Sequence, residues 1–388
     1  MDPVFRQLLI LMVVVWTVAV ALRRIGLPTV MGELVMGVIL GPAVLGWVEP
    51  SEIIEILAQL GIFFLMLHTG VKTEPQEFFS ALRVSLGVAI VGAIGPFSIA
   101  YIVARSFGLD MMAAVFCGLT MTATAVVVTV KILKDLKLDQ SRAAHIIVAS
   151  CVFDVLLTLI FFSVVLGVVG EGDLDLDPFV ILSFAAKATA FFVVVIVIGR
   201  WLYPLFRHPF REREGKGFAF VLVLGLAFGL FAEYLGLHII LGAYLAGLFF
   251  REEVASPDLI QKVEDRLDSI AYTLLGPIFF ISLGFHITFE ALSGAGLWFV
   301  IILTAAVAIG QILSAGGMAR LVRCSWSESL TVGVGMCGRA EMAFVLASIG
   351  LSIGTIDTNV FSVLIFTTFL LNIFASVGLW GIARQQKG

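Results

Sequence analysis

The sequence predicts an all-α protein that crosses a membrane many times, and composition and hydropathy pattern carry that prediction. Of its 388 residues, 60% are hydrophobic and 13% are charged, with a mean hydropathy of +1.09. A soluble domain is typically about 45–50% apolar and about 25% charged. The apolar segments have the ~20-residue length of membrane-spanning helices and lack the alternation of barrel strands. Nothing in the charge pattern indicates a nucleic-acid partner.

About thirteen apolar spans are expected along the chain. Their ranges are 4–22, 29–47, 52–70, 82–105, 110–134, 142–169, 178–204, 217–235, 237–250, 267–285, 295–319, 327–350 and 358–383. With the N-terminus placed outside, nearly all loop Lys and Arg residues fall on the inner side, and the acidic stretch 171–177 falls outside. Because cytoplasmic loops carry an excess of basic residues, we expect a multi-pass protein of the cell (inner) membrane with a cytoplasmic C-terminus.

Similar motifs recur in the two halves of the chain. Three pairs of segments match in the same order: 26–37 with 236–247, 62–64 with 278–280, and 118–121 with 333–336. The first and eighth spans are seven crossings apart, which is an odd number, so the two six-helix halves are expected to have opposite topology. Inverted repeats of this kind, here joined by a linker helix, are typical of secondary transporters.

Two spans at corresponding positions of the halves carry residues that interrupt helices. Hydroxyl side chains gather in Thr120–Thr124, and glycines gather in Gly333–Gly338. Threonine can bond to carbonyls of the preceding turn, and glycine costs ~1 kcal/mol relative to alanine inside a helix. Freed backbone groups are tolerated in a membrane only when they are buried or line a cavity, so paired breaks indicate a transport site. Ordinary close packing through small residues is the alternative.

Asp154 is the most informative residue. It lies near the middle of the apolar span 142–169, where a carboxylate costs roughly 2.5–3.5 kcal/mol to insert. Such residues usually face a bundle interior or a water-filled path and mark ion or proton routes. We expect Asp154 to bind a proton or a monovalent cation, with Thr122, Thr124 and Ser150 beside it. The alternative is a protonated aspartic acid that bonds to a neighbouring helix for packing alone.

These motifs resemble those of the monovalent cation:proton antiporter-two family, which includes Kef-type potassium transporters and NapA-type sodium:proton antiporters. The resemblance covers nearly the whole chain. It rests on 27–28 through 40–42, 57–61, 122–124, 153–154, 276–280, and 330–336 with Arg339 and Glu341. The segments are specific as an ordered set, although each is short.

The resemblance implies a NhaA/NapA-like fold with crossed broken helices, and an elevator-type motion of a core against a dimer bundle. The implied division is 1–75 and 211–290 for the dimer bundle, 171–210 for the linker helix, and 76–170 and 291–388 for the core. The family's ion-binding aspartate corresponds to Asp154. The implied partners are Na⁺ or K⁺, H⁺, the lipid bilayer and a second copy of the chain.

Two positions depart from the family pattern. The residue before the aspartate is usually Asp, Asn or Gln, but here it is Phe153. The sodium-exchanging branch has a Lys that aligns with Gln311, and that Lys pairs with the acid that Phe153 replaces. Because both the acid and the lysine are absent, neither charge is buried without its partner. One carboxylate, that of Asp154, is left to titrate, which favours electroneutral exchange. Phe153, Gln311, Arg339 and Glu341 are expected to support the core, with Arg339 and Glu341 as a structural pair. Direct contact of that pair with the ion is the alternative.

Other functions remain open at this stage. A sodium-coupled symporter of a small organic anion on a related fold would need a larger polar cavity, which Phe153 and the single central acid disfavour. An intramembrane enzyme would need a second catalytic group beside Asp154. Kef-type relatives carry a nucleotide-binding domain, whereas this sequence holds no strand–GxGxxG–helix unit, so we expect no cofactor and name a separate regulatory subunit as a candidate partner.

Overall fold

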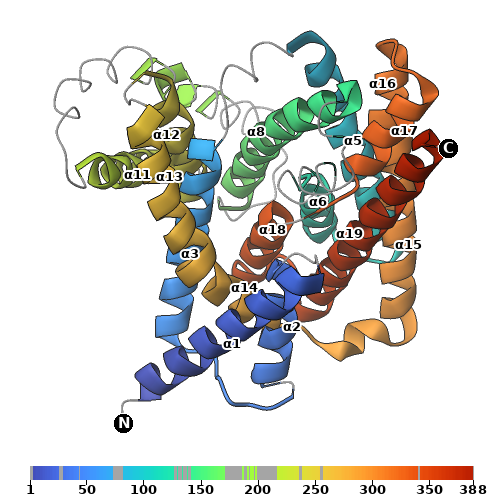
Figure 1. Cartoon of the computed structure of the whole chain (residues 1–388). Coiled ribbons are helices and arrows are strands. Elements are labelled where there is room, and N and C mark those ends of the chain that lie inside the picture. Colours follow the sequence, from blue (N-terminus) through green and yellow to red (C-terminus); the bar gives the residue numbers. More distant parts are fainter. Residues whose placement is uncertain are drawn as a thin grey trace. The chain divides into compact units, whose positions relative to one another are not determined.

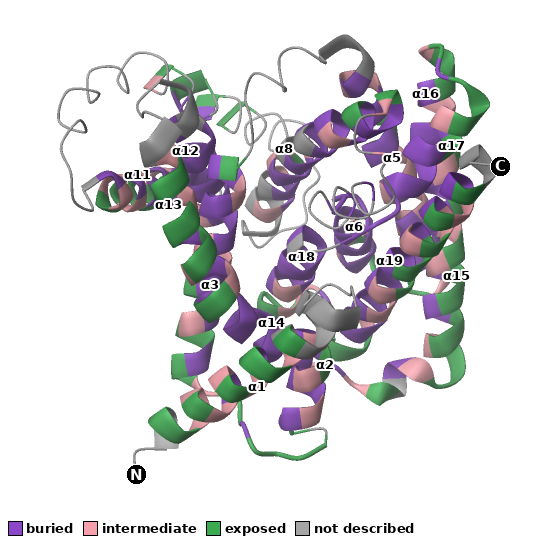
Figure 2. Cartoon of the chain, viewed as in Figure 1, coloured by how far each residue is buried: buried purple, intermediate pink, exposed green. Residues whose placement is uncertain are grey.

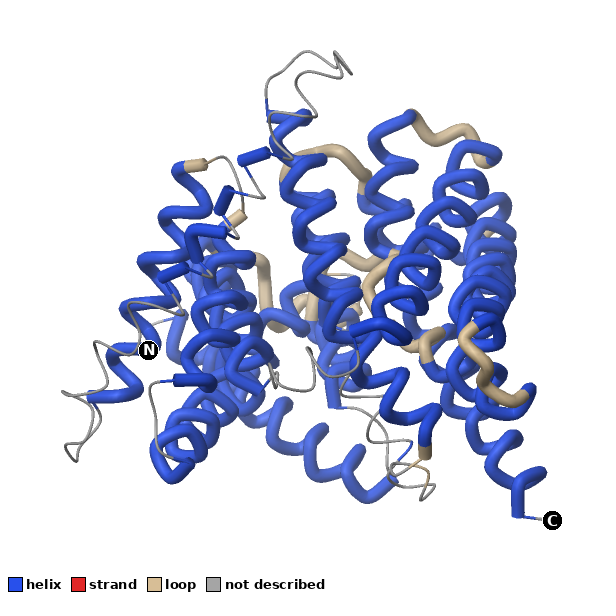
Figure 3. The backbone as a smooth tube through the Cα atoms, turned by 90° about the horizontal axis from the view of Figure 1, so that it is seen from above, coloured by secondary structure: helices blue, strands red, loops and turns tan. Residues whose placement is uncertain are grey.

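All regular structure in the described residues is helical (Figure 3). The computed structural model describes residues 3–25, 29–42, 44–72, 82–125, 141–170, 216–235, 238–253, 257–339 and 341–387, together with isolated positions in 129–138 and 186–198. Most of the expected seventh span, 178–204, and most of the second half of the fifth lie outside the described residues.

The helices of the described residues lie mostly within the expected spans, and Figure 1 labels them. They are α1 (Pro3–Ile25), α2 (Thr29–Leu40), α3 (Glu52–Lys72), α5 (Leu82–Ser106), α6 (Met111–Thr120), α8 (Arg142–Gly170), α11 (Lys216–Tyr234), α12 (Ile239–Glu253), α13 (Pro257–Asp268), α14 (Gly276–Gly284), α15 (Gly294–Gln311), α16 (Gly317–Leu321), α17 (Trp326–Gly335), α18 (Glu341–Ser352) and α19 (Thr358–Lys387). π-Helical turns η3 (Ser269–Leu275) and η5 (Ile312–Gly316) continue α13 and α15, and η4 (Phe289–Leu292) is a 3₁₀ turn.

Seven helices in the described part of the chain are long and apolar enough to cross a membrane, and four apolar helices of 10–17 residues accompany them. Exposed residues lie along α1, α11 and α15 (Figure 2), and many of them are large and apolar. Trp16 is 69% exposed and Leu230 is 60% exposed, which would be costly in water but suits contact with lipid. The prediction of an all-helical membrane protein is confirmed, whereas the number of thirteen spans stays a prediction.

The chain divides into two compact units, and each unit combines a stretch from each half of the sequence. One unit comprises Met1–Gln76 and Leu159–Phe285, and the other comprises Glu77–Thr158 and His286–Gly388. The second boundary along the chain falls inside α8, between Thr158 and Leu159, whereas the resemblance places the whole of 76–170 in one bundle. The part of α8 from Arg142 to Thr158, which carries Asp154, belongs to the second unit.

In the first unit, α3 packs on α12 and α14, and α2 packs on α14. Glycines of the repeated motif make these contacts close. A Cβ atom at Gly37 would lie 2.9 Å from the Cα of Gly284, and one at Gly247 would lie 2.7 Å from the backbone nitrogen of Val71. Real Cβ atoms do not approach this closely, so larger residues at either position would force the helices apart. The two glycines matched by the repeat thus have the same packing role.

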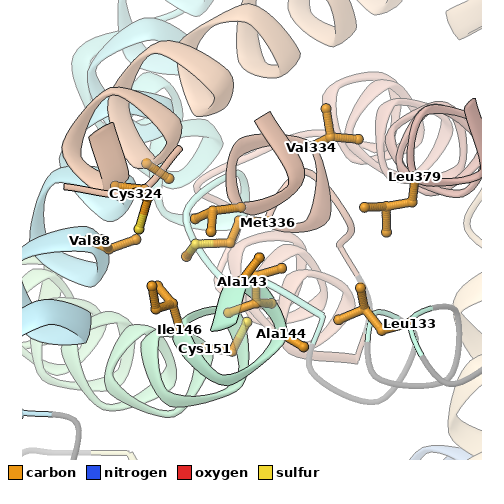
Figure 4. Close-up of a cluster of buried hydrophobic side chains, with 14 of the residues drawn as sticks. Val88, Leu133, Ala143, Ala144, Ile146, Cys151, Cys324, Val334, Met336 and Leu379 are labelled. Carbon is orange, nitrogen blue, oxygen red and sulfur yellow. The ribbon is translucent and has the colours of Figure 1, made fainter. Parts of the chain in front are cut away.

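In the second unit, α5 packs on α6 and α15, α6 packs on α18, and α17 packs on η5 and α19. A cluster of buried apolar side chains ties α8 into this group (Figure 4). Ala144 and Cys151 of α8 share the cluster with Met336 and Leu379. Its full membership is Val88, Leu133, Ala143, Ala144, Ile146, Ile147, Cys151, Ala315, Ala319, Cys324, Val332, Val334, Met336, Leu379 and Ile382. This packing holds the helix of Asp154 beside the end of α17.

Candidate functional site

The first break lies in the fifth expected span, where α6 ends at Thr120 and residues 121–125 are not helical. Asp110 caps the start of α6 by accepting a hydrogen bond from the backbone N–H of Ala113 at 2.9 Å. At the other end, the Thr122 hydroxyl donates to the carbonyl of Gly118 at 2.8 Å. That bond offers the last turn a partner outside the helical ladder, as the cluster of hydroxyl residues predicted.

The second break lies in the twelfth expected span, between α17 and α18. A capping box starts α17: the Ser325 hydroxyl accepts from the backbone of Glu328, whose carboxylate accepts from the backbone of Ser325 at 2.7 Å. The helix ends at Gly335, and residues 336–339 leave the helical path. At Gly333 a Cβ atom would lie 2.9 Å from the Cα of Ile312, so glycine also lets η5 approach α17.

The two breaks bond directly to each other. The backbone N–H of Ala125 donates to the carbonyl of Gly338 at 2.9 Å, and the Thr129 hydroxyl donates to the carbonyl of Gly335 at 3.0 Å. Both acceptors are carbonyls at or beyond the C-terminal end of α17, where intrahelical partners are missing. Each interrupted segment therefore satisfies backbone groups that the other leaves free, which a buried position requires.

Asp154 of α8 is completely buried against the first break. Its Oδ2 atom accepts two hydrogen bonds from Thr124, one from the backbone N–H at 3.0 Å and a short one from the hydroxyl. The other oxygen, Oδ1, is also buried and has no hydrogen-bond partner among the described residues. Thr124 thus holds one oxygen of the carboxylate, and the other oxygen has no hydrogen-bond donor among the described residues.

Arg339 is completely buried in the second break, and it bonds to the ends of both interrupted helices. Its Nε donates to the carbonyl of Met121 at 2.9 Å, and its Nη1 donates to the carbonyl of Met336 at 2.7 Å. Nη1 also reaches the carbonyl of Gly338 at 3.1 Å. Met121 and Met336 are the C-caps of α6 and α17, so the guanidinium charge lies at two partially negative helix ends. Arg339 and Asp154 form no ion pair within the described structure.

Gln311 supplies the remaining acceptor for Arg339. This fully buried side chain of α15 accepts from Nη2 of Arg339 through its Oε1 atom at 2.8 Å. The guanidinium can only donate, so the amide oxygen has to face it, and Nε2 points elsewhere. Within the described residues Nε2 has no partner. Gln311 therefore neutralises no charge and uses its amide oxygen as an acceptor for the guanidinium.

The comparison with protein families decides the classification. The sequence profile of the family described as sodium/hydrogen exchanger, transmembrane, matches residues 8–383. The chain belongs to this exchanger family. Membership confirms the resemblance to cation:proton antiporters, whereas the narrower Kef-type and NapA-type naming is not resolved by this match.

Individual relatives agree with the family. The exchanger is 32% identical over 355 residues to GerN of Bacillus cereus, named a Na⁺/H⁺-K⁺ antiporter, covering 89% of this chain and 88% of GerN. It is 27% identical to a Na⁺/H⁺ antiporter of Enterococcus hirae, covering 90% of each chain. Among solved structures, the sodium proton antiporter MjNhaP1 of Methanocaldococcus jannaschii matches with a TM-score of 0.78 at 18% identity, covering 98% of each chain. The fold is thus that of an antiporter, and these relatives are transporters rather than enzymes.

The other predicted site residues of the exchanger lie in the same unit but bond elsewhere. The Thr122 hydroxyl bonds within its own segment, and the Ser150 hydroxyl donates to the carbonyl of Ser85 in α5 at 3.1 Å. Phe153 is buried at 5% exposure beside Asp154 in the chain. The side chain of Glu341 lies outside the described residues, so its predicted pairing with Arg339 stays a prediction. The guanidinium partners that are described are three carbonyls and one amide.

One polar residue that contacts the second break is not among the residues predicted from the sequence. Asn372 of α19 accepts from the backbone N–H of Arg339 at 3.0 Å and returns a short hydrogen bond to the carbonyl of the same residue. It is 5% exposed. The signal was an amide side chain near the middle of the apolar span 358–383, because polar groups at that depth are costly without a specific partner.

Proposed function

We propose that the exchanger moves a monovalent cation, Na⁺ or K⁺, in one direction and H⁺ in the other, with Asp154 as the shared binding site. The Oδ1 atom of this buried carboxylate, which has no hydrogen-bond partner among the described residues, carries the proposal. Either a proton or a cation can neutralise it, and the two compete for the same charge. Competition of this kind couples the two flows. The names of the relatives favour exchange over the symporter of an organic anion.

Oxygen atoms around Asp154 would complete the cation site. The Thr124 hydroxyl donates its proton to Oδ2 of Asp154, so its lone pairs can face a cation. Ser150 lies four residues before Asp154 in α8, hence on the same helix face, and its hydroxyl proton is likewise engaged elsewhere. Thr122 is the third candidate hydroxyl. Oxygen ligands of this kind can replace the hydration shell of a small cation.

The charge balance favours exchange of one cation for one proton. Arg339 is engaged with two helix ends and Gln311, so its charge offsets those ends rather than forming an ion pair with Asp154. Within the described part of the site, Asp154 is the carboxylate left to change its charge state. One carboxylate that exchanges one monovalent cation for one proton gives an electroneutral cycle.

We also propose an elevator-type cycle, in which the second unit carries the site across the membrane against a dimer formed by the first unit. Asp154, both breaks, Gln311 and Asn372 all belong to the second unit, so rigid motion of that unit would keep the site intact. Two inverted six-helix repeats, an outer N-terminus and a cytoplasmic C-terminus complete the proposal. The mixing of stretches from both halves in each unit supports the repeats.

Transport by purified protein in liposomes with a trapped pH dye tests this function. Addition of Na⁺ or K⁺ outside should move protons in the wild type, with a rate unaffected when the membrane voltage is clamped. Asp154→Asn should abolish the cation-dependent signal. Asp110→Asn is the matched control, because asparagine also caps a helix and this residue lies at the start of α6. Wild-type exchange by Asp154→Asn would overturn the proposal.

A further inference from the structure

Asn372 bonds to a stretch of backbone that no helix satisfies. Arg339 lies between α17 and α18, so its N–H and C=O have no partner in a helical ladder. The Asn372 amide supplies both: its Oδ1 accepts from the N–H and its Nδ2 donates to the carbonyl. A buried backbone position held at both its polar groups by one side chain has little freedom to shift.

The geometry of this contact repeats that of Asp154. The spacing of 215 residues that separates the matched motifs at Gly118 and Gly333 also separates Thr124 from Arg339. At both positions the backbone N–H donates, at 3.0 Å, to the side-chain oxygen of a residue on a long neighbouring helix. That residue is Asp154 for the first break and Asn372 for the second. The second half of the chain thus holds an uncharged counterpart of the carboxylate.

The occupants of the two places differ in a way that charge explains. Asp154 leaves one oxygen for a proton or a cation. In the second break a permanent cation, the Arg339 guanidinium, is already present, and it bonds to carbonyls rather than to an acid. An amide at 372 can bond to the backbone on both sides, whereas a carboxylate could accept but not donate. An uncharged asparagine at position 372 therefore suits the second break, where Arg339 already supplies the charge and no ion is exchanged.

The two hydrogen bonds from Asn372 to the Arg339 backbone determine where the guanidinium lies. Arg339 reaches three separate segments: Met121 after α6, Met336 after α17, and Gln311 in α15. Hydrogen bonds of this kind hold within a few tenths of an ångström of 2.9 Å, so a small backbone shift would break several of them. Met121 begins the break whose Thr124 holds Asp154, so displacement of the guanidinium would reach the carboxylate.

We propose that Asn372 is a positioning residue of the exchange site, which acts by fixing Arg339 at the ends of both broken helices. The inference rests on the proposed function of Asp154. Arg339 places a positive charge near the site, and such a charge favours the ionised carboxylate and opposes a second cation. Asn372 thus sets the competition between proton and cation without touching either ion.

Exchange by Asn372→Ala in liposomes tests this role. The half-maximal rate should move to higher pH by about half a unit or more, because a carboxylate with a weaker positive neighbour releases its proton at higher pH. The apparent KM for the cation should change by about fivefold, the size of effect that one hydrogen bond typically carries. Thr368→Val is the matched control, since this buried hydroxyl of α19 donates to the carbonyl of Leu364 in its own helix and has no other partner among the described residues.

A double-variant cycle separates positioning from packing. The readout of the cycle is the release of protons on addition of Na⁺ or K⁺, a binding measurement that needs no turnover. If Asn372 acts through Arg339, its loss should have no further effect on the pH dependence of this release or on the cation concentration at its midpoint in the Arg339→Gln background. A packing role would lower thermal stability equally in both backgrounds and leave the pH dependence unchanged, which would overturn the proposal. If the alanine variant does not fold, Asn372→Asp goes through the same cycle, since it keeps the shape and the acceptor but loses the donor.

The outcomes also distinguish this inference from the proposed function. Exchange that needs Asp154 but is indifferent to Asn372 would refute the positioning role alone. Exchange that survives Asp154→Asn would refute the proposed function, whatever Asn372 does.

Discussion

The two broken helices perform different tasks from equivalent places. The first break is rich in hydroxyl residues, and its Thr124 donates to the Asp154 carboxylate, whose Oδ1 atom has no hydrogen-bond partner among the described residues. The second, rich in glycine, uses Arg339 to occupy the carbonyl ends of both interrupted helices. Under the proposed function, the comparison teaches that two similar backbone contacts can hold different charges: an exchangeable one at Asp154 and a permanent one at Arg339.

Removing the charge of Arg339 should have the largest effect on stability and exchange. Arg339→Gln leaves buried carbonyls at two helix ends without their donors, so we expect a loss of stability of about 3 kcal/mol or more and little exchange. Arg339→Lys should not restore activity, because an ammonium lacks the planar fork that reaches several acceptors. Thermal unfolding in detergent and transport in liposomes measure both effects.

Arg320→Gln is the control for that experiment. This arginine is exposed, donates to the carbonyl of Cys324 and stacks on Trp326, so its loss should leave exchange unchanged. Near-normal exchange by Arg339→Gln would contradict the role assigned to the second break.

Adding a second permanent charge should be the next largest change. Gln311→Lys replaces the acceptor of Arg339 with a buried ammonium that faces the guanidinium, and an unpaired buried charge is costly. We expect low yield of folded protein and exchange reduced about tenfold or more. Gln311→Glu keeps an acceptor and serves as the comparison variant, with better folding than the lysine variant. Equal behaviour of the two would show that Arg339 does not depend on this partner.

Removing the Thr124 hydroxyl, which donates to Asp154, should have a moderate effect on the pH dependence of exchange. Thr124→Val removes one donor to Asp154 but keeps the backbone bond, so the half-maximal rate should move to higher pH by about one unit. Thr122→Val should have a smaller effect, because that hydroxyl bonds within its own segment. A larger shift for Thr122→Val than for Thr124→Val would invert this order and identify Thr122 as the direct ligand.

Weakening the bond between the breaks should give the smallest effect. Thr129→Val removes the hydroxyl that donates to the carbonyl of Gly335, at a cost of about 1 kcal/mol. Stability in detergent should fall slightly, and the pH dependence of exchange should stay unchanged. A changed pH dependence would mean that the contact between the breaks also tunes the carboxylate.

The sequence predicted the residues whose placement is costly and left their partners unknown. Asp154 stands out because an acid within an apolar span is costly unless it has a specific partner or function. The hydroxyl and glycine clusters predict breaks from local chemistry alone. The partners of Arg339 are mostly backbone carbonyls, which look the same at every position of a sequence. Only the folded chain shows that Met121 and Met336 present theirs together.

Helix ends and unit boundaries were less predictable for a similar reason. Apolar composition continues through the fifth span to residue 134, yet α6 ends at Thr120 because its last turn bonds to Thr122 and Met121. The division of the chain within α8 leaves no compositional trace, because both parts of that helix are apolar. Asn372 was detectable as a polar residue in a span, but its partner lies 33 positions away in an irregular segment.

Proton release on cation binding tests the central claim most directly. Purified protein in weakly buffered detergent solution is titrated with Na⁺ or K⁺, and a pH indicator records the protons set free. At a starting pH low enough for the carboxylate to be protonated, competition at one carboxylate predicts release of about one proton per bound cation by the wild type and by Asp110→Asn, and none by Asp154→Asn. Cation-dependent release of protons by Asp154→Asn would contradict the assignment of Asp154 as the shared site.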